Sequence, residues 1–247
     1  MCDYATELRH RKNLFIAAAL MYSDNPTKQI SFNLVAICVF AITVSSLVTP
    51  LLNISSTLPV LIIFAIIVVT TLDGFFLQSA AAIILVDAIA STNPAYRQRI
   101  IEHEAGHFLV AYLLDIPITG YTLSAWESFK QGQSAQGGVM FAPPPADISS
   151  QLLQKYCTVW MAGIAAEKSL YSTSEGGTED LQKLRGVLFL AGKQQQEIVN
   201  QENLATLQAK VLIKDNWAAY QVLVTAMSNR VSVGDCYHEI ELNQPNP

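Results

Sequence analysis

The chain has 247 residues, a net charge of −5 and only 14% charged residues. This length accommodates one ordinary domain together with a membrane anchor. Nucleic acid is excluded as a main partner, because phosphate binding needs clustered lysine and arginine, and the densest basic group is only Arg9, Arg11 and Lys12. The four cysteines show no C-x-x-C spacing, so we expect separate thiols and no disulfide framework.

The apolar residues are concentrated near the N-terminus. No charged side chain occurs from Gln29 to Leu72, and turn-forming residues between Pro50 and Pro59 divide this stretch into two apolar runs. We therefore predict an N-terminal segment (residues 1–28) followed by a transmembrane helical hairpin (residues 29–76), with membrane lipid as a partner. Basic residues flank the hairpin on both sides, which predicts that both flanks lie on the cytoplasmic or stromal side.

The segment after the hairpin is apolar but short. Gly74–Val86 has too few residues to cross a bilayer, so we predict an interfacial or linker helix within residues 77–93. A third membrane crossing is the alternative, and it would invert the topology. Pro94, with Asn93 as its N-cap, should begin a new helix that continues to about Leu114.

The remaining chain predicts a mainly helical domain over residues 94–240 and a tail over residues 241–247, which should be frayed from Asn243 onward. Ile118–Trp126 and Gly138–Ala142 have strand-like compositions and should form a small β-hairpin with a long polar connection. Everything after Ile148 has helical character. The expected helices are Ser149–Tyr171, Thr178–Ala191 with Thr178 as its N-cap, and Leu204–Asn229 as one long or two short helices.

The strongest chemical signal is His103-Glu104-Ala105-Gly106-His107, an H-E-x-x-H motif. Histidines four residues apart leave the same face of a helix, so both imidazoles can bind one zinc ion. Glu104 is offset around the helix, where it can take a proton from water without binding the metal. The motif therefore predicts a zinc metallopeptidase with Glu104 as its general base.

A tetrahedral catalytic site needs a third protein ligand and one open position. Three downstream residues are candidates. His238 lies near the tail in no clear element and ranks low. Glu167 lies within an otherwise small and apolar helical stretch, and Asp180 lies in the first turn of a helix. From the residues alone both carboxylates also fit ordinary helix positions, because an acid in the first turn is favoured by the helix dipole.

The order of motifs resembles the peptidase domain of the FtsH family, the membrane-bound ATP-dependent zinc proteases. The resemblance covers residues 95–240. Residues 103–107 match that family's H-E-A-G-H, residues 162–167 resemble its G-G-R-A-A-E-E segment, and residues 176–180 resemble its G-A-x-N-D segment. It implies a zincin-like helical fold, Asp180 as the third zinc ligand and Glu167 as a residue that supports the site.

The chain departs from that family in three respects. Glu179 replaces the usual Asn, Ile164 replaces the usual Arg, and no G-x-x-x-x-G-K-S/T motif of an ATPase module occurs. ATPase-less relatives occur in photosynthetic organisms, so the resemblance implies a thylakoid or plasma membrane. Without an ATPase, the expected substrates are unfolded or flexible protein segments, and an FtsH-type or other membrane complex is a candidate partner.

The sequence thus predicts a membrane-anchored zinc metalloendopeptidase. A substrate could add as a strand beside Val139, Met140 and Phe141, although these residues could equally be plain hairpin core. The alternative function is a catalytically silent scaffold, or a zinc-binding partner protein, in a membrane complex. An intramembrane protease is disfavoured because charged residues, Arg99 and Glu102 among them, flank the motif. A transporter is disfavoured because no charged or broken helix pair marks a midplane site.

Overall fold

The computed structural model describes residues 39, 40, 43, 44, 61, 65, 68, 80–132, 137–145 and 148–245. The predicted segment 1–28, and the hairpin 29–76 apart from those isolated helical positions, lie outside the described residues. Within the described part, no helix is long and apolar enough to span a membrane.

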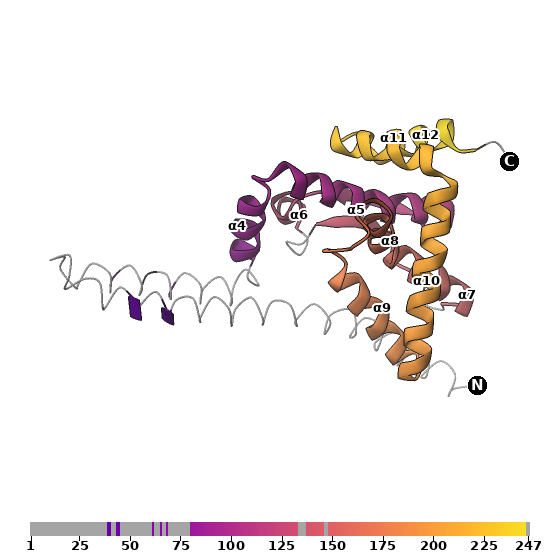
Figure 1. Cartoon of the computed structure of the whole chain (residues 1–247), viewed down its shortest axis with the longest axis horizontal. Helices are drawn as coiled ribbons and strands as arrows, with labels where there is room; N and C mark the ends of the chain where they lie inside the picture. Colours follow the sequence, from indigo (N-terminus) through magenta and orange to yellow (C-terminus); the bar gives the residue numbers. More distant parts are fainter. Residues whose placement is uncertain are drawn as a thin grey trace.

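The described chain is mainly helical, with one small antiparallel sheet, as predicted. The elements, labelled as in Figure 1, are α4 (Ala80–Ala90), α5 (Pro94–Leu113), β1 (Ile118–Thr122), α6 (Ala125–Lys130), β2 (Gly138–Phe141), α7 (Ser150–Trp160), α8 (Ala162–Tyr171), α9 (Thr178–Leu190), α10 (Gln195–Asp215), α11 (Trp217–Ser228) and α12 (Val233–Asn243).

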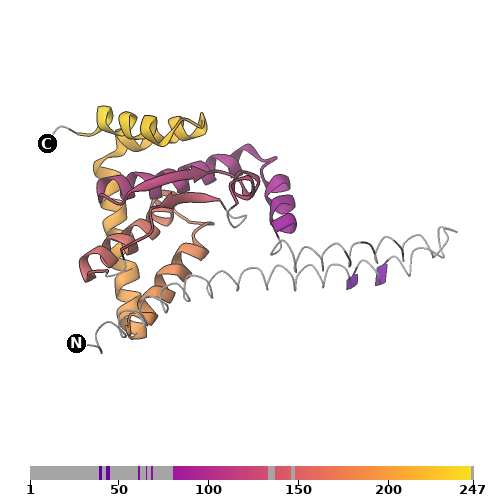
Figure 2. The same cartoon turned by 180° about the vertical axis from the view of Figure 1, so that it is seen from behind.

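Helix α5 is the centre of the fold. It begins as predicted, with Pro94 in its first turn and the Asn93 side chain accepting the N–H of Ala95. Its second half is almost entirely buried, because α8, α11, α7 and α10 all pack against it. Figure 2 shows the two strands beside this helix, which they also contact. Side chains such as Phe108 and Leu109 therefore form the middle of the core.

The predicted hairpin forms, but its connection differs from the prediction. Strand β1 pairs with β2 in a register that places Tyr121 opposite Val139. The strand expected to reach Trp126 ends at Thr122. The Ser124 hydroxyl accepts the N–H of Glu127 and caps the short helix α6, so the predicted loop is helical at its start. This local capping pattern outweighs the strand-like composition.

The C-terminal helices differ from the prediction mainly at their boundaries. The helix expected over 149–171 divides at Met161, whose torsion angles (φ −84°, ψ −3°) stay right-handed, so periodicity gives no sign of the break. Gly177, with a left-handed φ of 87°, is the N-cap that was assigned to Thr178. Helix α10 starts earlier than expected because Gln194 forms a capping box. His238, expected in no element, lies in α12.

Helix α4 confirms a helix within residues 77–93 and packs against α6. Its single acid, Asp87, accepts the backbone N–H of Ala125 at 2.9 Å, so this carboxylate supports the start of α6. This arrangement places α4 beside the cleft described below. Its predicted location at a membrane interface, and the division of the chain into domains, stay predictions.

Candidate metal centre

The two histidines of the H-E-x-x-H motif lie on the buried face of α5. His103 is 8% exposed and His107 is 5% exposed. Their Nε2 atoms approach to 3.0 Å, and the rings meet edge to face. One helical turn therefore directs both nitrogens to a common point, as the spacing predicted.

The opposite nitrogen of each ring is already engaged. His103 Nδ1 lies 2.7 Å from Glu167 Oε1, and His107 Nδ1 lies 2.7 Å from the carbonyl oxygen of Val159. A carbonyl and an ionised carboxylate can only accept hydrogen bonds, so both Nδ1 atoms carry the ring proton. In the neutral rings each Nε2 then presents a lone pair, which is the form that binds a metal.

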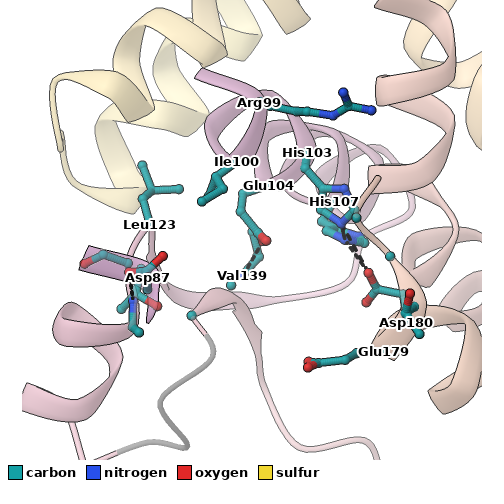
Figure 3. Close-up of a pocket in the computed structure, with 18 of the residues that line it drawn as sticks. Asp87, Arg99, Ile100, His103, Glu104, His107, Leu123, Val139, Glu179 and Asp180 are labelled. Atoms are coloured by element: carbon teal, nitrogen blue, oxygen red, sulfur yellow. Dashed lines mark hydrogen bonds and ion pairs between the residues drawn. The ribbon is translucent and has the colours of Figure 1, made fainter. Parts of the chain in front are cut away.

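Asp180 completes a group of three ligand atoms. Its Oδ2 lies 3.2 Å from the Nε2 atoms of both His103 and His107. Figure 3 shows this carboxylate pointing from α9 toward the two imidazoles. Asp180 lies in the first turn of α9, whose N-cap, Gly177, has no side chain.

These three atoms can hold a metal ion. Ligands at about 2.1 Å from a tetrahedral ion are separated by about 3.4 Å, close to the spacing found here. Two imidazole nitrogens and a carboxylate oxygen are also a chemically suitable donor set. Three ligands occupy three corners of a tetrahedron, which leaves its fourth corner open.

Glycines allow α8 to approach the histidine face of α5 closely. A Cβ at Gly106 would lie 2.7 Å from the Ala162 carbonyl oxygen, and a Cβ at Gly163 would lie 2.5 Å from His103 Cε1. Neither position can hold a larger residue without a shift of one helix. The small residues of α8 therefore place Glu167 and the carbonyl of α7 within reach of the two rings.

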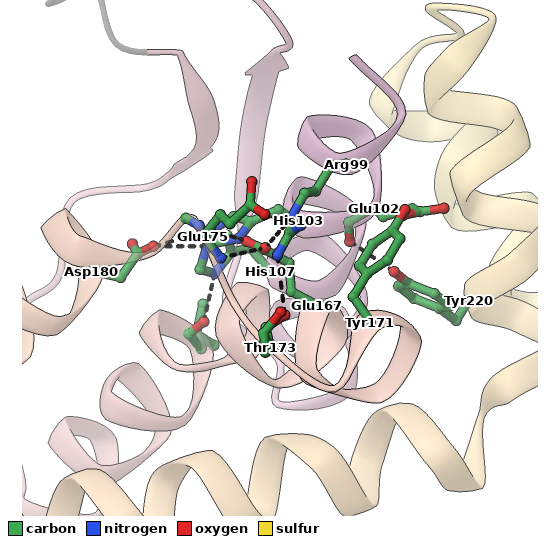
Figure 4. Close-up of polar contacts among 12 residues, drawn as sticks. Arg99, Glu102, His103, His107, Glu167, Tyr171, Thr173, Glu175, Asp180 and Tyr220 are labelled. Carbon is green, nitrogen blue, oxygen red and sulfur yellow. Dashed lines mark hydrogen bonds and ion pairs between the residues drawn. The ribbon is translucent and has the colours of Figure 1, made fainter. Parts of the chain in front are cut away.

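Glu167 is the most heavily hydrogen-bonded carboxylate of the site. It is 1% exposed and accepts hydrogen bonds from His103, from Arg99 and from the backbone N–H groups of Glu175 and Gly176 (Figure 4). Burial raises the pKa of Glu167, but His103, the Glu175 N–H and Arg99 together lower it to about 2. The structure thus places Glu167 behind His103, on the side of the ring opposite Nε2.

The metal-free cluster attracts positive charge. Burial lowers the pKa of His103, yet its hydrogen bonds to Asp180 and Glu167 and the charge of Glu104 raise it to about 10. For Asp180 burial acts in the opposite direction and raises the pKa, but the two histidines hold this pKa well below its usual value. A proton bound at His103 and a metal ion would satisfy the same concentration of negative charge, so the two compete for this site.

Glu104 lies beside the three ligand atoms, on the cleft. Its Oε2 accepts the N–H of Val139 at 2.9 Å, so β2 fixes the carboxylate (Figure 3). The cleft has a volume of about 570 Å³ and is lined by both histidines, Asp180, residues 137–139 and part of α4. The Glu104 carboxylate and the three ligand atoms therefore lie in one cleft.

Neighbouring side chains of the predicted substrate strand, β2, have different surroundings, because side chains along a strand alternate between its two faces. Val139 and Phe141 line the cleft and also pack against the core. The Met140 side chain instead lies over Gly120, its partner residue in β1. In the sheet that the structure describes, β2 pairs only with β1. Val139 and Phe141 therefore belong both to the hairpin core and to the wall of the cleft, while the binding of a substrate strand here stays a prediction.

Sequence reasoning missed several parts of the site. The carbonyl of Val159 supports the His107 ring, Arg99 binds Glu167 behind His103, and no motif pointed to either residue. His238 lies on the exposed side of α12 and is not in the three-residue group of the described structure. Cys157 and Cys236 are free and buried, which agrees with the expected thiols, while Cys2 and Cys38 lie outside the described residues.

No protein-family description and no curated protein matches this chain. The described structure is mainly helical and has a His-His-Asp group, with both histidines buried and Asp180 partly buried, that could hold a metal ion.

Proposed function

We propose that this protein is a membrane-anchored zinc metalloendopeptidase that resembles the FtsH peptidase domain but works without its own ATPase. One observation carries the proposal. The ligand atoms of His103, His107 and Asp180 lie 3.0–3.2 Å apart in a cleft that also contains Glu104. A general base next to a three-ligand metal site with one open position is the arrangement that metal-assisted peptide hydrolysis requires.

Zinc is the metal that this donor set favours. Structural and catalytic zinc sites use imidazole and carboxylate ligands at about 2.0–2.2 Å, and catalytic sites keep three protein ligands. When bound, zinc would supply Lewis acidity and bring the pKa of water toward neutrality. The hydrogen bonds that the Nδ1–H groups donate to Glu167 and to the Val159 carbonyl would fix both rings and strengthen them as ligands.

Glu104 would carry the proton transfers. Its carboxylate is held by the Val139 N–H at one oxygen, which restricts its rotation and leaves the other oxygen for water. Glu104 would accept a proton as water attacks the peptide carbonyl, and would then donate it to the leaving amine. The outer edge of β2 would align an extended substrate over these groups.

The substrates that suit this cleft are unfolded or flexible segments. The sequence has no ATPase motif to unfold a substrate, and an extended peptide fits an edge strand without rearrangement. Helix α4 follows the predicted membrane hairpin and lines the cleft through Ile83 and Val86. We therefore infer that the site works close to the membrane surface.

The decisive experiment compares wild-type protein with Glu104→Gln, both purified at full length in mild detergent. We expect about one zinc ion per chain in each, and a roughly 10²–10⁴-fold slower cleavage of fluorescein-casein by the variant. A zinc chelator should stop wild-type cleavage, and added zinc should restore it. Glu239→Gln, on α12 away from the cleft, is the matched control.

Each negative result has a definite meaning. Equal cleavage by Glu104→Gln and wild type would remove Glu104 from its role. Wild-type protein that binds zinc but cuts neither casein nor unfolded peptides would favour the silent scaffold. Protein that binds no zinc would refute the metal centre itself.

A further inference from the structure

Arg99 reaches from α5 to α8 and to the loop that follows it (Figure 4). Each guanidinium nitrogen has a different partner. Nε donates to Glu167 Oε2 at 2.5 Å, Nη2 donates to the Thr173 carbonyl at 3.1 Å, and Nη1 lies 2.8 Å from Glu175 Oε1. The guanidinium carbon also lies 4.7 Å from the centre of the Tyr171 ring. One side chain therefore fixes the end of α8 and the start of the loop in several directions.

Glu167 binds the same loop from the other side. Its Oε2 accepts the N–H of Glu175 at 2.9 Å, and its Oε1 accepts the N–H of Gly176 at 3.1 Å. The same Oε1 lies 2.7 Å from His103 Nδ1. Arg99 and Glu167 thus form a partly buried ion pair that joins the histidine helix to the loop.

Besides these hydrogen bonds, the loop (residues 172–177) is held at its end, where Gly177 packs closely against Ile164. Its sequence, Ser-Thr-Ser-Glu-Gly-Gly, contains no apolar side chain that could enter the core. It is mostly exposed, and both of its ends, Ser172 (φ 64°) and Gly177 (φ 87°), are left-handed. Asp180 follows only three residues after Gly177. The position of the loop therefore helps to set the position of the third ligand atom, together with the packing of α9 against α7 and α10.

We propose that Arg99 is a positioning residue of the metal centre. By clamping loop 172–177 together with Glu167, it holds Asp180 opposite His103 and His107, although its own contacts are with the loop and α8. This inference rests on the proposed metal site. A simpler role, in which Arg99 only neutralises the buried Glu167, would act on His103 alone and leave Asp180 in place.

A double-mutant cycle separates the two roles. The full-length protein in detergent is titrated with Co²⁺, whose visible absorption depends on the number and geometry of its ligands. We expect Arg99→Met to weaken Co²⁺ binding by about 10-fold or more, with a spectrum that shifts toward that of Asp180→Ala. If Arg99 acts through Asp180, the double variant should bind no more than about 3-fold more weakly than Asp180→Ala alone.

Two further variants complete the test. Arg97→Met removes an exposed guanidinium from the same helix and should bind Co²⁺ like wild type. Arg99→Lys keeps the charge but cannot reach three partners at once, so it should give an intermediate affinity and remains informative if Arg99→Met fails to fold.

Three results would overturn the proposal. Wild-type affinity in both Arg99 variants would refute the positioning role while leaving the metal centre intact. If the losses of Co²⁺ affinity in the two single variants multiply in the double variant, Arg99 acts through Glu167 and His103 alone. Wild-type protein without Co²⁺ or Zn²⁺ binding would refute the proposed metal centre, and this inference with it.

Discussion

Replacement of Gly163 by alanine is the most direct test of the packing that builds this site. The new Cβ would lie 2.5 Å from His103 Cε1, and closer still to Nε2 and Cδ2 of the same ring. Carbon atoms in normal contact are about 3.5–4.0 Å apart, so the ring and α8 must separate by at least about 1 Å. The ring is buried and hydrogen-bonded to Glu167, which itself belongs to α8, so no simple rotation relieves the clash.

The expected loss is large because metal sites tolerate little displacement. Ligand distances in functional sites stay within about 0.2 Å of their ideal values, whereas this change requires several times more. We expect Gly163→Ala to lower zinc affinity by about 10–100-fold, and to destabilise the metal-free protein by about 1–3 kcal/mol through overpacking.

Two measurements check this prediction. Competition with a chromophoric chelator gives the zinc affinity, and urea unfolding of the metal-free protein gives the stability. Gly234→Ala, in the first turn of α12, is the matched control, because its new Cβ would meet only Ser232 Oγ at an ordinary 3.7 Å. Its zinc affinity should be unchanged and its stability equal or higher by at most about 1 kcal/mol. A Gly163→Ala protein with wild-type affinity and stability would refute the packing argument.

Two further predictions concern the same helix contact and its buried acid. Gly106→Ala would place a Cβ 2.7 Å from the Ala162 carbonyl oxygen and should destabilise the protein by about 1–3 kcal/mol, measured by urea unfolding; an unchanged midpoint would contradict it. In the metal-free protein the pKa of Glu167 falls from 4.5 to about 2 on folding. Its contribution is therefore fully present above pH 4.5 and is lost as the pH falls toward 2. The contribution is on the order of 3 kcal/mol. The stability lost between pH 6 and pH 3 should be smaller in Glu167→Gln than in wild type, and equal losses would count against the role of this carboxylate.

Local sequence signals determined much of the described fold. Asn93 and Pro94 mark the start of α5, and the composition of the two strands marks the hairpin, because caps, proline and alternation act over a few residues. The H-E-x-x-H spacing placed two imidazoles on one helical face for the same reason. The predicted helix boundaries were wrong where the local sequence signal was weak. At Met161, for example, the torsion angles stay helical across the break.

The tertiary structure decided how the site is completed. From the residues alone, Asp180 and Glu167 were both ordinary helix acids, and only the resemblance assigned them different roles. The position of Glu167 depends on α8 approaching α5 across Gly106 and Gly163, and Asp180 follows a loop that Glu167 holds; both are contacts between segments far apart in the chain. The roles of Arg99 and of the Val159 carbonyl could not be predicted from the sequence for a related reason. Hydrogen bonds to a backbone carbonyl, or to a loop 74 residues away, leave no local pattern in the sequence.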